Sequence, residues 1–188
     1  MKYSFFFFKL IIYLLISLNA TASEKWILDK KLSTISFELP VLFINKVQGS
    51  FSEIEGLINI DKDKNKNKAI FSVNIESINL NYNKYKSLLL SPTFFNSDKF
   101  PIAIVDTKKF SYNKEDKLEI IVELTIKGTT RKVPLQLEIL HLTKELIQIK
   151  GELIFLRTDF KIGEGKWLST TILRNKTVIE TNLFLFKE

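Results

Sequence analysis

The stretch LEIIVELTIKGTTRKVPLQLEIL, residues 118–140, alternates apolar and polar side chains on both sides of a Lys-Gly-Thr-Thr turn. A period of two puts alternate side chains on opposite faces of a strand. The apolar face comprises Leu118, Ile120, Val122, Leu124 and Ile126 before the turn, and Val133, Leu135, Leu137 and Ile139 after it. A short glycine-containing turn between two such runs predicts an antiparallel β-hairpin with one buried face.

The same alternation recurs along most of the chain after Ser23. Further apolar faces are Ile35, Phe37 and Leu39; Ala69, Phe71, Val73 and Ile75; and Ile147, Ile149, Gly151, Leu153 and Phe155. A last run covers residues 177–186. About eight strands follow from this pattern, and a meander of that size closes into a barrel to remove its exposed edges. The sequence therefore predicts an all-β fold, an extended eight-stranded antiparallel β-barrel.

Local signals refine this prediction. The runs 46–60 and 130–142 are each longer than the usual strand of about five or six residues, which indicates a tall barrel. Gly49 and Gly56 in the first run are expected to relieve crowding or to mark bulges. Residues 82–90 form the only expected helical connection, with one or two short helices, and Ser91-Pro92 ends it because the residue before proline disfavours helical geometry.

The first 22 residues have the pattern of a secretory signal peptide. They combine Lys2, an apolar block over residues 10–18 and a small-residue site at Ala20-Thr21-Ala22. The block is shorter than the roughly 20 residues that a spanning helix needs, although an uncleaved anchor is the alternative. We therefore expect a cleaved signal peptide, residues 1–22, a single mature domain, residues 23–188, and a periplasmic location.

Composition excludes several classes of function. The chain has no cysteine, so it has no disulfides, no zinc–thiolate site and no cysteine nucleophile. Its formal charge of +7 is spread along the sequence, which argues against a nucleic-acid-binding surface. The densest cluster, residues 61–68, mixes both signs and is typical of a solvated hairpin loop.

Residues 91–101, SPTFFNSDKFP, have the turn-forming residues of a surface loop but carry three phenylalanines. Taken with Trp26-Ile27-Leu28-Asp29, Val47-Gln48-Gly49-Ser50-Phe51, residues 124–133 and Arg157-Thr158-Asp159-Phe160, this loop resembles the YceI family of exported lipid-binding proteins. The resemblance covers essentially the whole predicted mature chain. Leu32 and Val41 stand where many members of that family carry histidines, so any role of those histidines is absent here.

The resemblance implies a lipocalin-like barrel whose apolar tunnel holds a long-chain isoprenoid or fatty-acyl lipid. Phe94 and Phe95 match the paired aromatics of the family and are expected to fold over part of the tunnel. No cofactor or metal is expected. Membrane contact would be transient, and the sequence does not define the oligomeric state. The candidate ligand-binding residues are Phe37, Leu39, Phe51, Phe71, Val73, Ile75, Phe94, Phe95, Ile102, Ile104, Val122, Leu124, Leu137, Leu153, Phe155 and Trp167.

Groups suited to catalysis are scarce, and we predict that the protein is not an enzyme. His141 is the only histidine, and no Gly-x-Ser-x-Gly motif is present. Arg157 and Asp159 are open to two interpretations: Arg157 meets a polar ligand end, or the two residues pair to close a turn at the end of the barrel.

Three functions remain open on these grounds. The favoured one is a carrier of a long-chain lipid. The second is a stress-related interaction protein whose barrel is filled by its own side chains. The third is a lipid-modifying enzyme, which would need a polar cluster at the tunnel mouth that the sequence does not show.

Overall fold

The computed structural model describes residues 23–41, 44–61, 63–113 and 115–188. The predicted signal peptide lies outside the described residues. The strands are β1 (Glu24–Leu28), β2 (Thr34–Val41), β3 (Ile44–Phe51), β4 (Ile54–Ile60), β5 (Lys68–Asn74), β6 (Ile78–Leu80), β7 (Ile102–Asp106), β8 (Lys117–Ile126), β9 (Thr129–His141), β10 (Leu146–Leu156) and β11 (Lys176–Lys187). The helix α2 (Lys86–Leu90) and short 3₁₀ turns at Ile75–Ser77, Asn83–Tyr85, Arg157–Phe160 and Gly165–Leu168 complete the elements.

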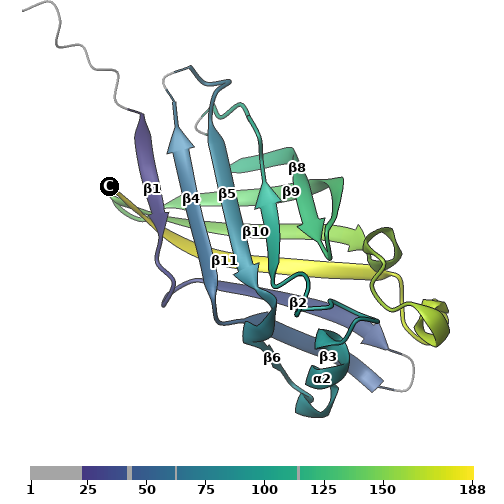
Figure 1. Ribbon diagram of the computed structural model, residues 1–188. Coiled ribbons are helices and arrows are strands. Elements are labelled where there is room, and N and C mark those ends of the chain that lie inside the picture. The colour runs from purple at the N-terminus through teal and green to yellow at the C-terminus, as the bar shows by residue number, and fades with distance from the viewer. Residues whose placement is uncertain (1–22, 42–43, 62, 114) are drawn as a thin grey trace, which may run out of the picture.

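These strands form one closed antiparallel barrel. Pairing runs in the order β1-β4-β5-β7-β8-β9-β10-β11, and β11 pairs with β1 again, with Lys187 opposite Trp26. Three pairs of consecutive short strands, β1 with β2, β3 with β4, and β5 with β6, are the two halves of single bent strands, so the barrel has the eight strands that the alternation predicts. Figure 1 shows β1, β4 and β5 crossing β9, β10 and β11 at a steep angle, with the C-terminus beside β1.

The bend between β1 and β2 lets both halves pair with the same edge of β11. Residues 185–187 of β11 face β1, whereas residues 178–182 face β2. The Asp29 carboxylate accepts hydrogen bonds from the Lys31 and Leu32 amides, at 2.8 and 3.1 Å, and so stabilises the turn between the halves. Asp side chains favour such turns because they satisfy backbone donors two or three residues on.

The predicted continuous strand 46–60 is interrupted, because β3 ends at Phe51 and β4 begins at Ile54. The two glycines relieve crowding rather than form bulges, since the pairing of Phe37 with Gly49 and of Phe71 with Gly56 is regular. A Cβ at Gly49 would lie 2.4 Å from the Phe37 ring, and one at Gly56 would lie 2.2 Å from the Phe71 ring. The glycines thus make room for two large inward-facing rings.

The helical connection covers residues 83–90, within one residue of the predicted 82–90. A 3₁₀ turn at Asn83–Tyr85 leads into α2, which ends at Ser91, where the backbone is extended (φ −64°, ψ 164°) ahead of Pro92. The helix therefore ends just before Pro92, as predicted. Its first turn is a 3₁₀ helix rather than an α-helix, and residues 81–84 there are exposed.

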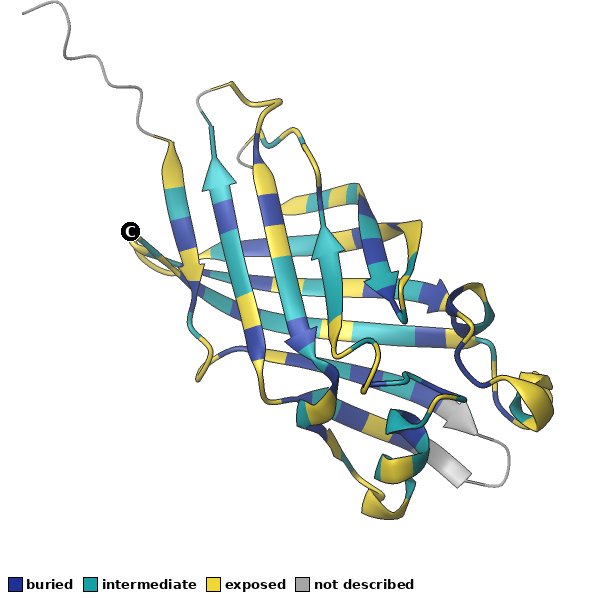
Figure 2. Ribbon diagram, viewed as in Figure 1, coloured by how far each residue is buried: buried dark blue, intermediate teal, exposed yellow. Residues whose placement is uncertain are grey.

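The core lies inside the barrel and follows the predicted apolar faces. Figure 2 shows buried and exposed positions alternating along the strands. The hairpin of β8 and β9 turns at Lys127 and Gly128, which both have positive φ (49° and 70°), the geometry of a tight two-residue hairpin turn. Within the described part of the chain, no helix has the length and apolar character needed to cross a membrane.

Candidate functional site

The barrel encloses a cavity of about 730 Å³. Ligand pockets typically have volumes of about 300–1,000 Å³ and mostly apolar walls. The wall here consists mainly of aliphatic and aromatic side chains contributed by the strands around the barrel. The size and lining of this cavity suit a ligand with a large apolar surface.

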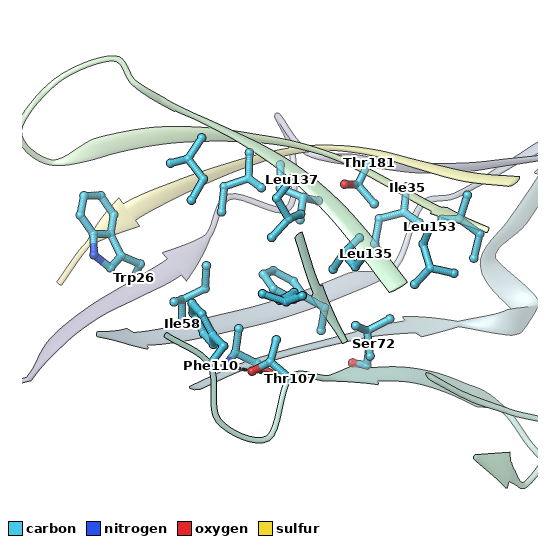
Figure 3. Close-up of a pocket in the computed structure, with 18 of the residues that line it drawn as sticks. Trp26, Ile35, Ile58, Ser72, Thr107, Phe110, Leu135, Leu137, Leu153 and Thr181 are labelled. Atoms are coloured by element: carbon cyan, nitrogen blue, oxygen red, sulfur yellow. Dashed lines mark hydrogen bonds between the residues drawn. The ribbon is translucent and has the colours of Figure 1, made fainter. Parts of the chain in front are cut away.

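The lining residues are spread along the length of the cavity. In Figure 3, Trp26, Phe110 and Thr107 lie toward one end, and Ile35 and Leu153 lie toward the other. Cross-strand register explains the first end, because Trp26 stands opposite both Ile58 and Lys187. Phe37, Phe51, Phe95 and Phe155 add aromatic surface to the lining, with the Phe37 and Phe51 rings 5.8 Å apart.

The three phenylalanine rings of the loop 91–101 lie in three different environments. Phe94 is 2% exposed and packs edge-on against Trp167, with ring centroids 5.7 Å apart. Phe95 lines the cavity. Phe100 packs on the β8–β9 turn, where a Cβ on Gly128 would lie 2.5 Å from its ring. The rings therefore attach the loop to the barrel, and one of them closes the cavity wall.

Backbone hydrogen bonds hold the loop in this arrangement. The Phe95 amide donates to the Leu89 carbonyl at 2.9 Å, and the Asn96 amide donates to Ser91 at 2.9 Å. Asn96 has a positive φ of 53°, a conformation that asparagine tolerates better than most residues. The Gly163 amide donates to the Thr93 carbonyl at 2.9 Å and so joins the loop to the segment after β10.

The structure brings most of the predicted ligand-binding residues together. Those that line the cavity are Phe37, Phe51, Phe71, Val73, Ile75, Phe95, Ile104, Leu124, Leu137, Leu153 and Phe155. Those outside its lining are Leu39, Phe94, Ile102, Val122 and Trp167. Leu39, Phe94 and Val122 are instead buried in the packed core, and Trp167 supports Phe94 from the next loop.

Ile102 on β7 lies outside the cavity lining. Ile102 is 42% exposed, whereas Ile104, two residues further on, is half-buried and lines the cavity together with its partner Ser72. The inward residues are Ala103 and Val105, which pair with Val73 and with Phe71 and Leu124. The run Ile-Ala-Ile-Val is apolar on both faces, so its alternation does not show which face is buried.

Sequence reasoning also missed part of the lining. The missed apolar residues include Trp26, Ile58, Ala103, Val105, Phe110, Ile120, Ile126, Leu135, Ile139, Ile147, Ile149, Ile179 and Leu183. Six of these residues, Ile120, Ile126, Leu135, Ile139, Ile147 and Ile149, lie on apolar faces that the alternation already marks as inward. Phe110 lies in the connection after β7, where no periodicity points to it, and its amide donates to the Asn67 carbonyl at 3.0 Å.

Arg157 holds main-chain carbonyls rather than Asp159, so its contacts match neither interpretation of the motif in full. Its guanidinium is 1% exposed and hydrogen-bonds to main-chain carbonyls, including Ile162 at 2.8 Å and Trp167 at 2.8 Å. Asp159 is exposed. Among the residues that the structure describes, it is not an ion-pair partner of Arg157. Burial lowers the pKa of Arg157, and the carbonyl acceptors offset the loss of water around its charge.

Polar groups of the lining gather near the ends of β4, β9 and β11. Tyr112 and His141 form a hydrogen bond of 3.3 Å between the Tyr112 hydroxyl and Nε2. Burial, with a smaller contribution from the Asp116 carboxylate, raises the pKa of the Tyr112 hydroxyl. Over the described ranges, no three His, Asp or Glu side chains are grouped in a way that could hold a metal ion.

Phe94 and Phe95 should respond differently to truncation. Phe94→Ala is expected to lower the free energy of unfolding by about 3 kcal/mol, because it removes a fully buried ring. Phe95→Ala should cost less, since Phe95 is half-buried against an existing cavity. Urea denaturation of both variants measures this, and equal losses would contradict the separate placement of the two rings.

The chain is thus a closed eight-stranded antiparallel barrel around a largely apolar cavity. The YceI-like domain matches residues 26–183, and the chain belongs to this family. Protein YceI of Salmonella newport is 28% identical over 131 residues, which cover 68% of each chain. A UPF0312 protein of Staphylococcus aureus is 32% identical over 110 residues, and the match spans only 60% of that relative.

Solved structures share the fold at low sequence identity. BcnA of Burkholderia cenocepacia superposes with a TM-score of 0.76 at 20% identity, covering 84% of this chain and 98% of BcnA. A domain of Saccharophagus degradans described as polyisoprenoid-binding gives a TM-score of 0.68 at 14% identity, covering 87% and 98% of the two chains. These likenesses confirm the predicted barrel.

Proposed function

We propose that the protein is a periplasmic carrier that holds one long-chain apolar lipid, of isoprenoid or fatty-acyl type, inside the barrel. The observation that carries the proposal is the apolar cavity of about 730 Å³ enclosed by the strands. The described ligand class of the Saccharophagus degradans neighbour is in keeping with it. Residues 1–22, read as a signal peptide, support the periplasmic part of the proposal.

Burial of the chain alone supplies sufficient affinity for such a ligand. Each methylene transferred from water to the barrel contributes about 0.8 kcal/mol. A chain of a dozen carbons would therefore bind well without a specific polar contact along most of its length. A polar group in the middle of the chain would be disfavoured, because the wall around it is largely apolar.

The alternatives receive less support. A barrel filled by its own side chains would leave no cavity of this size. An enzyme would need a nucleophile or an acid–base pair aligned on the reacting part of the ligand. The titratable side chains of the described lining lie in loops and at strand ends, away from most of the apolar wall. We therefore propose binding without catalysis.

Purification of the exported protein without detergent, followed by native mass spectrometry, tests this function. The expected result is a mass increment of one lipid that denaturation releases, because a preformed apolar cavity retains its ligand. Lipid extraction then identifies the class. Protein that carries no lipid and takes up none from a long-chain lipid mixture would refute the carrier function.

A further inference from the structure

The titratable groups of the cavity lining lie in loops and at strand ends rather than along the barrel wall. They are Glu24, Asp61, Lys64, His141, Lys144 and Lys187, and Tyr112 lies among them. We call these seven residues the polar mouth. Register places Lys187 opposite Trp26, the residue at one end of the cavity in Figure 3. The lining thus combines a charged end with an apolar interior.

Hydrogen bonds connect the loops that form the polar mouth. The Tyr112 amide donates to the Lys64 carbonyl at 3.3 Å, and the Asn67 side chain donates to the same carbonyl at 2.7 Å. The Tyr112 hydroxyl reaches His141 at the end of β9. Lys144 follows in the β9–β10 turn, which the Leu142 amide closes by donating to Leu146 at 3.0 Å. These hydrogen bonds therefore fix the loops of the polar mouth relative to one another.

The charges of the polar mouth are unevenly compensated. Lys187 forms an ion pair with Glu24, with Nζ and Oε1 2.9 Å apart. The Asp61 carboxylate accepts a hydrogen bond from the Asp63 amide at 2.9 Å. Lys64 and Lys144 have no ion-pair partner among the residues that the structure describes, although both line the cavity. Two cations are thus available to a ligand. The carboxylates that oppose them are Asp61, which belongs to the polar mouth, and Asp116, whose charge acts on the Tyr112 hydroxyl.

We propose that the polar mouth binds an anionic head group, a carboxylate or a phosphate monoester, at the end of the lipid chain, with Lys64 and Lys144 as its cationic contacts. Tyr112 adds a neutral hydroxyl donor, since a tyrosine hydroxyl is protonated at neutral pH and burial raises its pKa further. The lipid then enters tail-first, with its apolar end toward Leu153. This inference rests on the proposed function and narrows its ligand to single-chain amphiphiles with a terminal anion.

Competition between ligands of equal chain length tests the head group separately from the chain. The assay measures displacement of a fluorescent fatty-acyl probe from the full mature protein at low ionic strength. The three competitors are dodecanoate, dodecyl phosphate and dodecan-1-ol. We expect both anions to bind about tenfold more tightly than the alcohol, the scale of two partly exposed charge contacts. The advantage should shrink as salt is added, because salt screens such contacts.

The variant Lys64→Gln/Lys144→Gln is expected to bind the alcohol unchanged and to bind the anions only about twofold more tightly than the alcohol, since both cationic contacts are gone. The matched control is Lys132→Gln/Lys150→Gln, which removes two exposed lysines from strands β9 and β10 away from the cavity lining. This control should keep the tenfold preference.

Four results would overturn the assignment. They are equal affinity of the wild type for the alcohol and the anions, loss of the preference in the control pair alone, a preference that survives loss of Lys64 and Lys144, and displacement by inorganic phosphate at the concentrations at which dodecyl phosphate acts. Tight binding of the alcohol in these cases leaves the carrier function intact. If none of the three chains binds, the carrier function fails as well.

Discussion

Arg157→Leu is expected to lower the free energy of unfolding by about 4 kcal/mol, the scale for breaking a buried, hydrogen-bonded charge. The guanidinium is 1% exposed and donates to the carbonyls of Ile162, Gly163, Trp167, Leu168, Leu173 and Arg174, at 2.8 to 3.4 Å. Leucine leaves these acceptors without a donor in a buried site, where each unsatisfied group is costly. The loss in free energy of unfolding therefore exceeds that of an ordinary large-to-small substitution in an apolar core.

The geometry makes the position specific for arginine. Gly163 has a φ of 77°, and a Cβ there would lie 2.8 Å from Arg157 Nη1, so the chain wraps closely around the guanidinium. Arg157→Lys keeps the charge but replaces a planar fork of five donors by a single ammonium. We expect it to lose about 2 kcal/mol, because several carbonyls stay unpaired.

Equilibrium unfolding in urea measures both changes against Arg131→Leu. Arg131 is an exposed residue of β9 that donates to the neighbouring Thr130 carbonyl at 3.0 Å, so this control should stay within about 0.5 kcal/mol of the wild type. An Arg157→Leu protein as stable as the control would contradict the structural role and reopen the ligand-contact interpretation.

The barrel was predictable because its strands carry an unambiguous period of two. The β8–β9 hairpin shows this best, since its Lys127-Gly128 turn and its inward face follow directly from the residues. The bends were not predictable in the same way. Whether the chain at Ser52 and Glu53 continues or bends depends on which strands lie beside it, and β3 pairs with β2 whereas β4 pairs with β1.

The cavity was predictable only where one face of a strand is polar. On β7 both faces are apolar, and pairing with β5 and β8 decides that Val105 faces inward. Phe94 and Phe95 are neighbours in a tight turn, so their rings separate, and sequence reasoning placed both over the cavity. The polar mouth joins Lys64, Tyr112 and Lys144, which lie far apart in the sequence and meet only through the closed topology.

Leu124→Trp should weaken the binding of a long-chain lipid at least about 100-fold. Leu124 lies on β8, is 2% exposed and lines the cavity. An indole projecting there displaces part of the bound chain, and the loss of even four methylene contacts, at about 0.8 kcal/mol each, exceeds a hundredfold. Overpacking of a filled core lowers the free energy of unfolding by about 1–3 kcal/mol. Because Leu124 borders the cavity, we expect the loss for Leu124→Trp to lie at the low end of this range.

Substitutions at two neighbouring positions distinguish a blocked cavity from a disturbed core. Ile121 lies on the outer face of the same strand and is 59% exposed, so Ile121→Trp adds the same ring outside the barrel. Val122 is 1% exposed but does not line the cavity, so a larger residue there would strain the core without entering the ligand space. Ile121→Trp is therefore the matched control.

The dissociation constant of a fluorescent fatty-acyl probe, measured for the wild type, Leu124→Trp and Ile121→Trp, tests the central claim most directly. Each protein is first shown by urea denaturation to be folded. The account predicts tight binding by the wild type and by Ile121→Trp, and a loss of at least about 100-fold for folded Leu124→Trp. Equal binding by all three proteins would contradict it, because the lipid would then lie outside the barrel.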